Sequence, residues 1–290
     1  MLPLGVLYTF TSPFNFFVFK ICNYRSITIK NNLKNSFPEL PGHQLSNIEK
    51  AFKGHFSKLI FEGIKNLDFS KKQLTNRFHF ENLEELEEIY FQNQSVVLLS
   101  SHVENWEWLI TSLGIHLKHR VFGIGMPLTN SFFNKKLNAK RERFGLKVIH
   151  AKNYKEELTQ CKSPFAVLVL ADQSPPNTEN AYWTTFLHQN SGFFFGPEYL
   201  ANTYNAAVMY LHVKEVKKGY YSCSIESIEK SPKQQEFGEI TKKYVQKLEN
   251  QIQQNPAKWL WSHKRWKRTP PTNLEGLIQK QKTRFTKKFR

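Results

Sequence analysis

The chain has 290 residues, enough for one large domain or two small ones with a buried core. Its formal net charge of +17 favours an anionic partner: nucleic acid, an anionic membrane surface or an acidic protein. Only three cysteines occur (Cys22, Cys161 and Cys223), and their wide, irregular spacing argues against a disulfide framework or a cysteine metal site.

The first 19 residues carry no charged side chain, and basic residues follow from Lys20 onward. About 20 apolar residues span a bilayer as a helix. This stretch has the length, but Pro3, Pro13 and Asn15 make it less apolar. We expect residues 1–24 to form a membrane-associated helical segment, which either spans the bilayer or lies at its interface. The alternative is a buried N-terminal helix. The basic residues that follow predict that the rest of the chain stays on the cytoplasmic side.

Periodicity then predicts alternating helices and strands. Apolar residues at helical spacing predict helices, and short apolar runs predict strands, several of them apolar on both faces. This alternation favours an α/β fold with a mostly parallel central sheet flanked by helices. The segment 220–228 alternates as an antiparallel or edge strand would. The predicted helices are 47–67, 83–93, 129–144, 153–161, 196–205 and 235–254, and the predicted strands are 95–101, 120–126, 147–150, 165–171, 206–213 and 220–228.

Polar residues follow two of these predicted strands. His102 comes directly after 95–101, and Asp172 and Gln173 come directly after 165–171. In open α/β sheets, ligands bind beyond the carboxyl ends of the strands. Both strands are therefore expected to deliver polar side chains to one edge.

His102 has two nearby carboxylates, Glu104 and Glu107. A histidine acts as a directed base when a partner fixes its tautomer. On a regular helix, five residues would place His102 and Glu107 on different faces. They can converge if His102 lies in the strand-to-helix turn and Glu107 in the first turns of the helix. A histidine that is merely a satisfied turn residue is the simpler alternative.

The stretch "HVENWE" (102–107) resembles the H-x4-D/E signature of the glycerolipid acyltransferase superfamily, and more narrowly that of bacterial lipid A late acyltransferases of the lauroyl/myristoyl type. Five further stretches agree with that family in order, so the resemblance covers roughly residues 1–270. They are "NNLKNSFPEL" (31–40), "KRERFGLKVI" (140–149), "LADQSP" (170–175), "TFLHQNSGFFFGPEYLA" (185–201) and the tryptophan-rich "NPAKWLWSHKRWKR" (255–268).

The resemblance implies a glycerol-phosphate acyltransferase-like fold and an O-acyltransferase that moves a fatty acyl chain from acyl carrier protein to a hydroxyl of a lipid A precursor. His102 would be the general base and Glu107 would orient it. An acyl thioester is the expected co-substrate, with no cofactor and no metal. The expected substrate-binding residues are Arg141, Arg143, Asp172, Gln173, Trp261, His263 and Arg265.

The resemblance also implies a location at the cytoplasmic face of the bacterial inner membrane. The expected partners are acyl carrier protein, a glycolipid acceptor and an anionic membrane surface, with no nucleic acid. We expect the acyltransferase domain to cover residues 25–270 and a basic tail to cover 271–290. From Lys264 to the C-terminus, ten Lys and Arg residues accompany one acid, Glu275.

Three other functions remain as alternatives. The first is an acyltransferase with another lipid acceptor. The second is a basic nucleic-acid-binding protein, suggested by aromatic residues interleaved with cations in 259–267. The third is a metal hydrolase that uses His102, Glu104, Glu107 and Asp172, although the ligand spacing expected for such a site is absent from the sequence.

Overall fold

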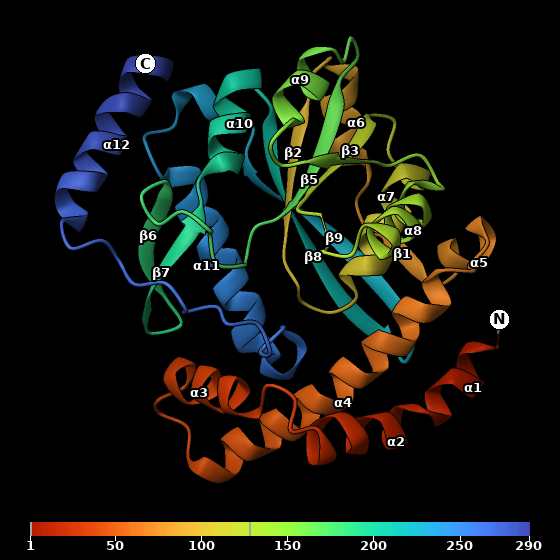
Figure 1. Ribbon diagram of the computed structural model, residues 1–290. Helices are drawn as coiled ribbons and strands as arrows, with labels where there is room; N and C mark the ends of the chain where they lie inside the picture. The colour runs from red at the N-terminus through yellow and green to blue at the C-terminus, as the bar shows by residue number, and fades with distance from the viewer. Residues whose placement is uncertain (1, 128) are drawn as a thin grey trace.

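A seven-stranded sheet forms the centre of the protein (Figure 1) in a computed structural model that describes residues 2–127 and 129–290. The strands lie in the order β1-β9-β8-β2-β5-β3-β4. All neighbours are parallel except β8 and β9, which are antiparallel. The strand bounds are β1 (Phe78–Phe80), β2 (Val96–Ser100), β3 (Arg120–Gly125), β4 (Lys147–His150), β5 (Phe165–Leu170), β8 (Ala207–Lys217) and β9 (Tyr220–Glu229).

Helices that precede, connect and follow the strands cover the faces and edges of the sheet. Their bounds are α3 (Ser26–Ser36), α4 (Gly42–Asn66), α5 (Lys71–Thr75), α6 (Glu84–Phe91), α7 (Trp106–His116), α8 (Ser131–Glu142), α9 (Tyr154–Thr159), α10 (Gly196–Tyr204), α11 (Glu239–Gln254) and α12 (Leu274–Phe289), with short 3-10 turns η2 (Pro232–Gln234) and η3 (Pro256–Lys258). These elements confirm the predicted α/β class. Of the two alternatives for 220–228, the antiparallel strand is confirmed, and the edge strand is wrong because β9 lies between β1 and β8.

Alternate residues of the central strands fill two separate cores. Val97 and Leu99 of β2 pack on the side of α10, α11 and the C-terminal tryptophans. Val96 and Leu98 pack on the side of α6 and α7. Both faces of β2 are apolar because both are covered, as its continuous apolar run predicts.

A separate antiparallel hairpin was not predicted. It consists of β6 (Ala181–Phe186) and β7 (Gln189–Phe194), joined by Leu187 and His188 in left-handed backbone conformations. The turn lacks the Gly or Asn that usually marks such a hairpin, so the sequence gives little signal for it. The hairpin packs beside α11 (Figure 1), and its Phe186 and Phe193 are fully buried.

The N-terminal segment is helical and lies along α4 (Figure 1). It comprises α1 (Leu4–Thr9), α2 (Thr11–Phe16) and the π-helix η1 (Phe17–Ile21). Leu4–Ile21 is long and apolar enough to cross a membrane, and only 17% of it is buried. Met1, the first residue of the expected membrane segment, lies outside the described residues.

The C-terminal segment 271–290 forms the helix α12 at the opposite end of the molecule from α1 (Figure 1). Phe285 is its buried contact, with ring centroids 5.8 Å from Phe195 and 5.7 Å from Phe237. The Lys and Arg residues of α12 are exposed, and Lys288 Nζ lies 4.5 Å from the centre of the Tyr199 ring of α10.

Candidate active site

The pairing of β2 with β5 places two polar residues side by side. In this parallel register Ser100 is opposite Leu170, the last residue of β5. His102 and Asp172 each lie two residues beyond this pair, at the carboxyl edge of the sheet. The prediction that the two strands deliver polar groups to one edge is therefore confirmed.

His102 makes two hydrogen bonds with Asp172. The imidazole Nδ1 lies 2.8 Å from Asp172 Oδ1, and the His102 backbone N–H donates to Oδ2 at 3.0 Å. A carboxylate on Nδ1 fixes the proton there and leaves the Nε2 lone pair available as a base. The Gln173 amide Nε2 lies 3.2 Å from this atom and donates to its lone pair, so a substrate hydroxyl would have to take the place of this amide. The side chain of His102 is 16% exposed, so part of the imidazole faces solvent.

Asp172 is buried and remains ionised. Burial is the largest influence and by itself raises its pKa, but the charge of His102 and hydrogen bonds from His102 and Trp259 together lower the pKa to about 2. The Trp259 indole N–H donates to Oδ2 at 2.8 Å. Asp172 is therefore a fixed negative charge behind the imidazole, suited to stabilise an imidazolium.

The prediction that Glu107 contacts His102 is wrong. Arg141 of α8 binds the Glu107 carboxylate with two N–H groups, and Arg141 Nε lies 3.1 Å from Oε2. The cause is the start of α7: Asn105 caps it by accepting a hydrogen bond from the Trp108 backbone N–H. Glu107 then lies in the first turn and faces α8 rather than the preceding loop.

Glu104 also points away from the imidazole. It adopts a left-handed backbone conformation (φ 54°), and its backbone N–H donates to the Lys258 carbonyl. Its buried side chain lies 3.5 Å from Lys258 Nζ and 3.8 Å from His55 Nε2. Neither carboxylate near His102 in sequence is thus its partner.

His55, Glu104 and Glu215 form a buried cluster whose possible ligand atoms lie within 4.8 Å of one another. The ammonium groups of Lys58 and Lys258 contact Glu215, the latter at 2.7 Å. Burial and these two ammonium groups lower the pKa of His55 well below its usual value. Because two cations already balance the two carboxylates, we interpret the cluster as an ion-pair network that holds α4 to the loop after β2.

Asn105 and Glu62 support the loop from the other side, and sequence reasoning missed Glu62. The Asn105 amide donates to the buried Glu62 carboxylate at 2.7 Å. The Trp108 indole donates to the Glu62 carbonyl at 3.1 Å. The sequence could have indicated Glu62, because it is a charged residue on the apolar face of α4 and such residues are rarely buried without partners.

Arg143 holds the end of α8 in place and does not point to the imidazole. Its guanidinium donates to the Asn66 carbonyl at 2.7 Å and to the Phe69 carbonyl at 3.4 Å. Burial lowers its pKa. We therefore assign Arg143 a structural role instead of the expected contact with substrate.

The C-terminal tryptophan segment packs behind Asp172. Trp261 is fully buried and donates to the Pro256 carbonyl at 2.6 Å. His263 Nε2 accepts a hydrogen bond from the Ser174 backbone N–H at 3.3 Å, and burial is the main cause that lowers its pKa to about 4. His263 is therefore neutral and fixes the loop after β5.

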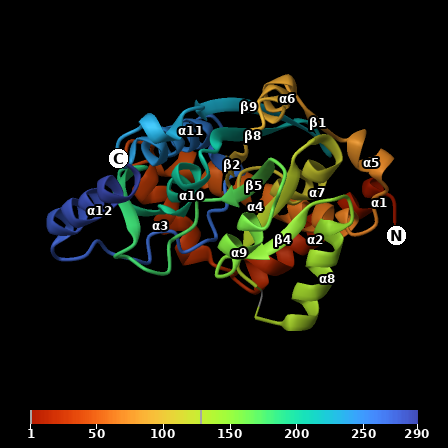
Figure 2. The same cartoon turned by 90° about the horizontal axis from the view of Figure 1, so that it is seen from above.

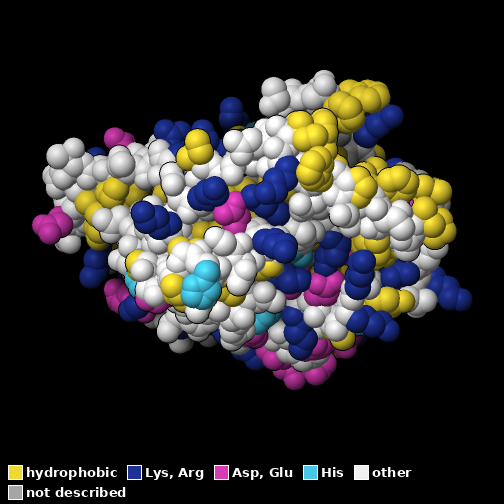
Figure 3. Space-filling view, turned by 90° about the horizontal axis from the view of Figure 1, so that it is seen from below, with side chains coloured by type: hydrophobic (Ala, Val, Ile, Leu, Met, Phe, Trp, Pro, Cys, Tyr) yellow, Lys and Arg dark blue, Asp and Glu magenta, His cyan; other side chains and the backbone are white. Residues whose placement is uncertain are grey.

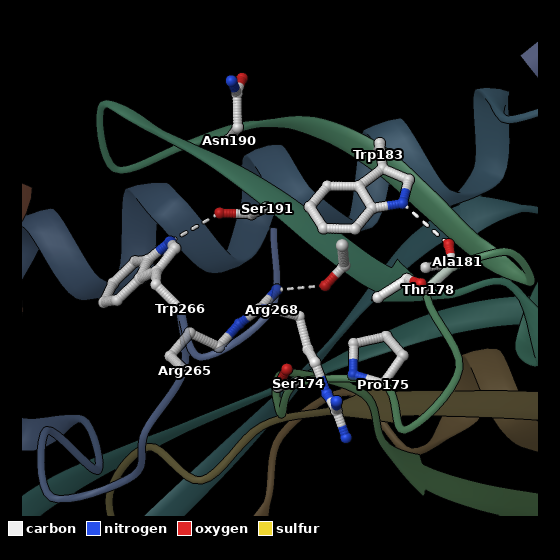
Figure 4. Close-up of a pocket in the computed structure, with 11 residues that line it drawn as sticks. Ser174, Pro175, Thr178, Ala181, Trp183, Asn190, Ser191, Arg265, Trp266 and Arg268 are labelled. Atoms are coloured by element: carbon white, nitrogen blue, oxygen red, sulfur yellow. Dashed lines mark hydrogen bonds between the residues drawn. The ribbon is translucent and has the colours of Figure 1, made fainter. Parts of the chain in front are cut away.

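Arg265 is buried as well. It donates to the Gly192 carbonyl at 2.7 Å and lies 4.4 Å from the centre of the Phe193 ring. Burial is the main cause that lowers its pKa to about 10. Figure 4 shows it reaching from the C-terminal segment toward the β6–β7 hairpin, beside a small pocket that Ser174 and Trp266 also line. Trp261 and Arg265 thus support the site from inside the protein, and their burial argues against the direct contact with substrate that the resemblance implied.

The fold and the site together define an α/β enzyme with a histidine–carboxylate pair at the carboxyl edge of its sheet. The family of bacterial lipid A biosynthesis acyltransferases matches residues 1–268, and the chain belongs to this family. The protein is therefore an acyltransferase of lipid A biosynthesis, with an acyl donor and a lipid acceptor as substrates. Comparison with curated proteins found no match.

Proposed function

We propose that this protein transfers a fatty acyl chain from the thioester of acyl carrier protein to a hydroxyl of a lipid A precursor, with His102 as general base. The observation that carries the proposal is the His102–Asp172 pair, which places the base Nε2 at a partly exposed position, where an acceptor hydroxyl would take the place of the Gln173 amide. Its place within the family match supports the acyl-transfer chemistry.

The reaction needs one proton carrier. His102 Nε2 takes the proton of the acceptor hydroxyl as its oxygen attacks the thioester carbonyl. The tetrahedral intermediate collapses, the C–S bond breaks, and the imidazolium returns the proton to the thiolate. Asp172 stabilises the imidazolium between these steps. The acceptor oxygen is the nucleophile, so the enzyme does not need a covalent acyl intermediate.

We assign Arg141 to an anionic group of the substrate or to the developing oxyanion. It is partly exposed, and a guanidinium held on one side by Glu107 still has N–H groups to offer. Glu107 then positions Arg141, in place of the role first expected for it at His102.

We further propose that the enzyme lies on the cytoplasmic face of the inner membrane, with the N-terminal segment in the interface. Two polar contacts support an interfacial position over a spanning one. Tyr8 donates to Glu62, and Asn15 lies 3.2 Å from Ser57, so one side of the segment is bound to α4. The other side carries exposed Phe16, Phe17 and Ile21.

The test is acyl transfer by the purified protein with acyl carrier protein thioester and a lipid A precursor. His102→Ala should lower kcat by about two to four orders of magnitude, because general base catalysis contributes that much. His79→Ala, at an exposed position on β1, is the matched control and should retain activity. Activity that survives His102→Ala, or that a chelator abolishes, would contradict the mechanism.

A panel of acceptors separates the remaining alternatives. Transfer to another lipid hydroxyl but not to a lipid A precursor would favour the other-acceptor hypothesis. Strongly salt-dependent binding to DNA or RNA without acyl transfer would favour the nucleic-acid hypothesis.

A further inference from the structure

Helix α8 projects from the body of the molecule (Figure 2). All of its residues are described, and none of them is buried. Its outer surface presents Phe132 (59% exposed) and Phe133 (61%), and Met126 (66%) precedes it in the loop after β3. Large exposed apolar side chains grouped in this way mark an interaction surface.

The same surface is basic. Lys135, Lys136 and Lys140 are exposed on α8, and the sequence has no Asp or Glu between Met126 and Arg141. Lys136 Nζ lies 4.4 Å from the centre of the Phe132 ring. Aromatic rings beside cations suit the boundary between lipid headgroups and acyl chains. We call these six residues the α8 face: Met126, Phe132, Phe133, Lys135, Lys136 and Lys140.

The α8 face lies on the same half of the molecule as the exposed N-terminal segment. Figures 1 and 2 both place α8 and the N-terminal helices on the right of the molecule, with α8 beside α7 and α2 below it along α4, and Figure 3 shows hydrophobic side chains gathered along the N-terminal helices and toward that projecting edge. The exposed apolar residues of the N-terminal segment are Leu2, Val6, Phe10, Phe16, Phe17 and Ile21. Two apolar surfaces on one side can contact one bilayer together.

Helix α8 also connects this surface to the candidate active site. Arg141, near the end of α8, binds Glu107 in the first turn of α7. The neighbouring Trp106 ring contacts His102, with centroids 5.1 Å apart. Binding of α8 to a surface would therefore also hold the Arg141 guanidinium in place, and we assign this group to substrate binding.

We propose that the α8 face is a second lipid-contacting surface, which inserts Phe132 and Phe133 into an anionic phospholipid leaflet while the N-terminal segment lies in the same interface. This proposal rests on the membrane location given in the proposed function. The three lysines, together with the apolar residues, select an anionic lipid surface as the occupant. An acidic protein such as an acyl carrier is the competing occupant and is an outcome of the test.

The first experiment reports on α8 independently of the N-terminal segment and of catalysis. In the full chain with Cys22→Ser and Cys161→Ser, Phe133→Cys is labelled with an environment-sensitive fluorophore and mixed with phosphatidylglycerol-containing vesicles. An interfacial side chain enters lipid by about 5–10 Å, so we expect a blue shift and about twofold or greater quenching by lipid-borne nitroxide. Phe91→Cys on α6 is the matched control, since Phe91 is 70% exposed, and we expect no change there.

Two outcomes would overturn the proposal. One is a probe at position 133 that stays in water while the protein is bound to vesicles. The other is a probe that responds to acyl carrier protein alone, which would make the α8 face a protein-docking surface. Both readings are independent of whether the protein shows acyl transfer, so the failure of the proposed function would be seen separately.

A second experiment tests the charge of the α8 face. Replacing Lys135, Lys136 and Lys140 with Gln should weaken binding to anionic vesicles by about fivefold per lysine, while binding to neutral vesicles stays unchanged. Replacing Lys280, Lys282 and Lys287 of α12 with Gln removes equal charge from the opposite end. If the α8 and the α12 replacements weakened binding to anionic vesicles equally, a specific contact at α8 would be contradicted.

Discussion

At the scale of the residue, position along the strands was predictable and side-chain pairing was not. The apolar runs 95–101 and 165–171 placed His102 and Asp172 at one edge from sequence alone. Their hydrogen bond depends on the register of β2 against β5, which joins residues 70 apart in the chain. Sequence proximity pointed to Glu104 and Glu107 instead. A left-handed residue at Glu104 and the Asn105 cap then turn both carboxylates away.

The Asp172 carboxylate should determine how well His102 acts as a base during catalysis. Asp172→Asn keeps the shape but loses the charge, so we expect kcat to fall by about two to four orders of magnitude and the pH–rate profile to change shape. Glu107→Gln is the matched control. It weakens the contact to Arg141 and should lower activity while keeping the shape of the profile. The reverse pattern would restore Glu107 as the residue that orients His102.

Asp172 should also contribute to stability in a defined pH range. Its pKa is about 2 in the folded protein against a usual value of 3.8, so its ionised form stabilises the fold above about pH 4. This contribution, about 2 kcal/mol at neutral pH, is lost as the pH falls from about 4 toward 2. Urea unfolding at pH 7 and pH 3 should show that the deficit of Asp172→Asn shrinks at the lower pH. A loss of stability in Asp172→Asn that is larger at pH 3 than at pH 7 would contradict a lowered pKa of Asp172.

At the scale of the element, a close approach of backbones fixes α8 relative to α7. Gly145 follows α8 with a φ of 103°, and a Cβ on it would lie 3.2 Å from the Gly114 carbonyl oxygen. A Cβ on Gly114 would lie 2.5 Å from the Phe144 carbonyl oxygen. This contact gives a physical reason for the glycine four residues after Arg141, which sequence reasoning noted only as part of a resemblance. It also sets where Arg141 meets Glu107.

Gly114→Ala should therefore be destabilising although Ala favours helices. Helix propensity favours Ala by about 1 kcal/mol, but overpacking against backbone atoms costs about 1–3 kcal/mol or more. The second effect should dominate because backbone atoms cannot rotate away. Gly63→Ala on α4 is the matched control: a Cβ there meets nothing within 4 Å, so stability should rise. The free energy of unfolding of both variants can be measured by urea denaturation. A Gly114→Ala protein as stable as the wild type would contradict the close approach of α7 and the loop after α8.

At the scale of the whole molecule, the alternation of helices and strands was enough to predict the α/β class. The β6–β7 hairpin and the course of the N-terminal segment were not predictable, because both depend on contacts with distant elements. The N-terminal segment illustrates this. Its composition allows a bilayer span, yet Tyr8 and Asn15 bind α4. Such polar contacts distinguish a helix that packs on the protein from one that crosses the membrane, and composition alone does not reveal the partners of these side chains.

The manner of membrane attachment can be tested by washing membranes that carry the full chain. An interfacial helix held by apolar side chains should resist high salt, because salt screens only the charged contacts. Alkaline carbonate should release it, whereas a spanning helix would stay with the bilayer. Phe16→Ser with Phe17→Ser removes two exposed aromatic side chains and should make high salt sufficient for release. Release of the unaltered chain by salt alone would mean that charge holds it, and retention through carbonate would mean that Leu4–Ile21 spans the membrane.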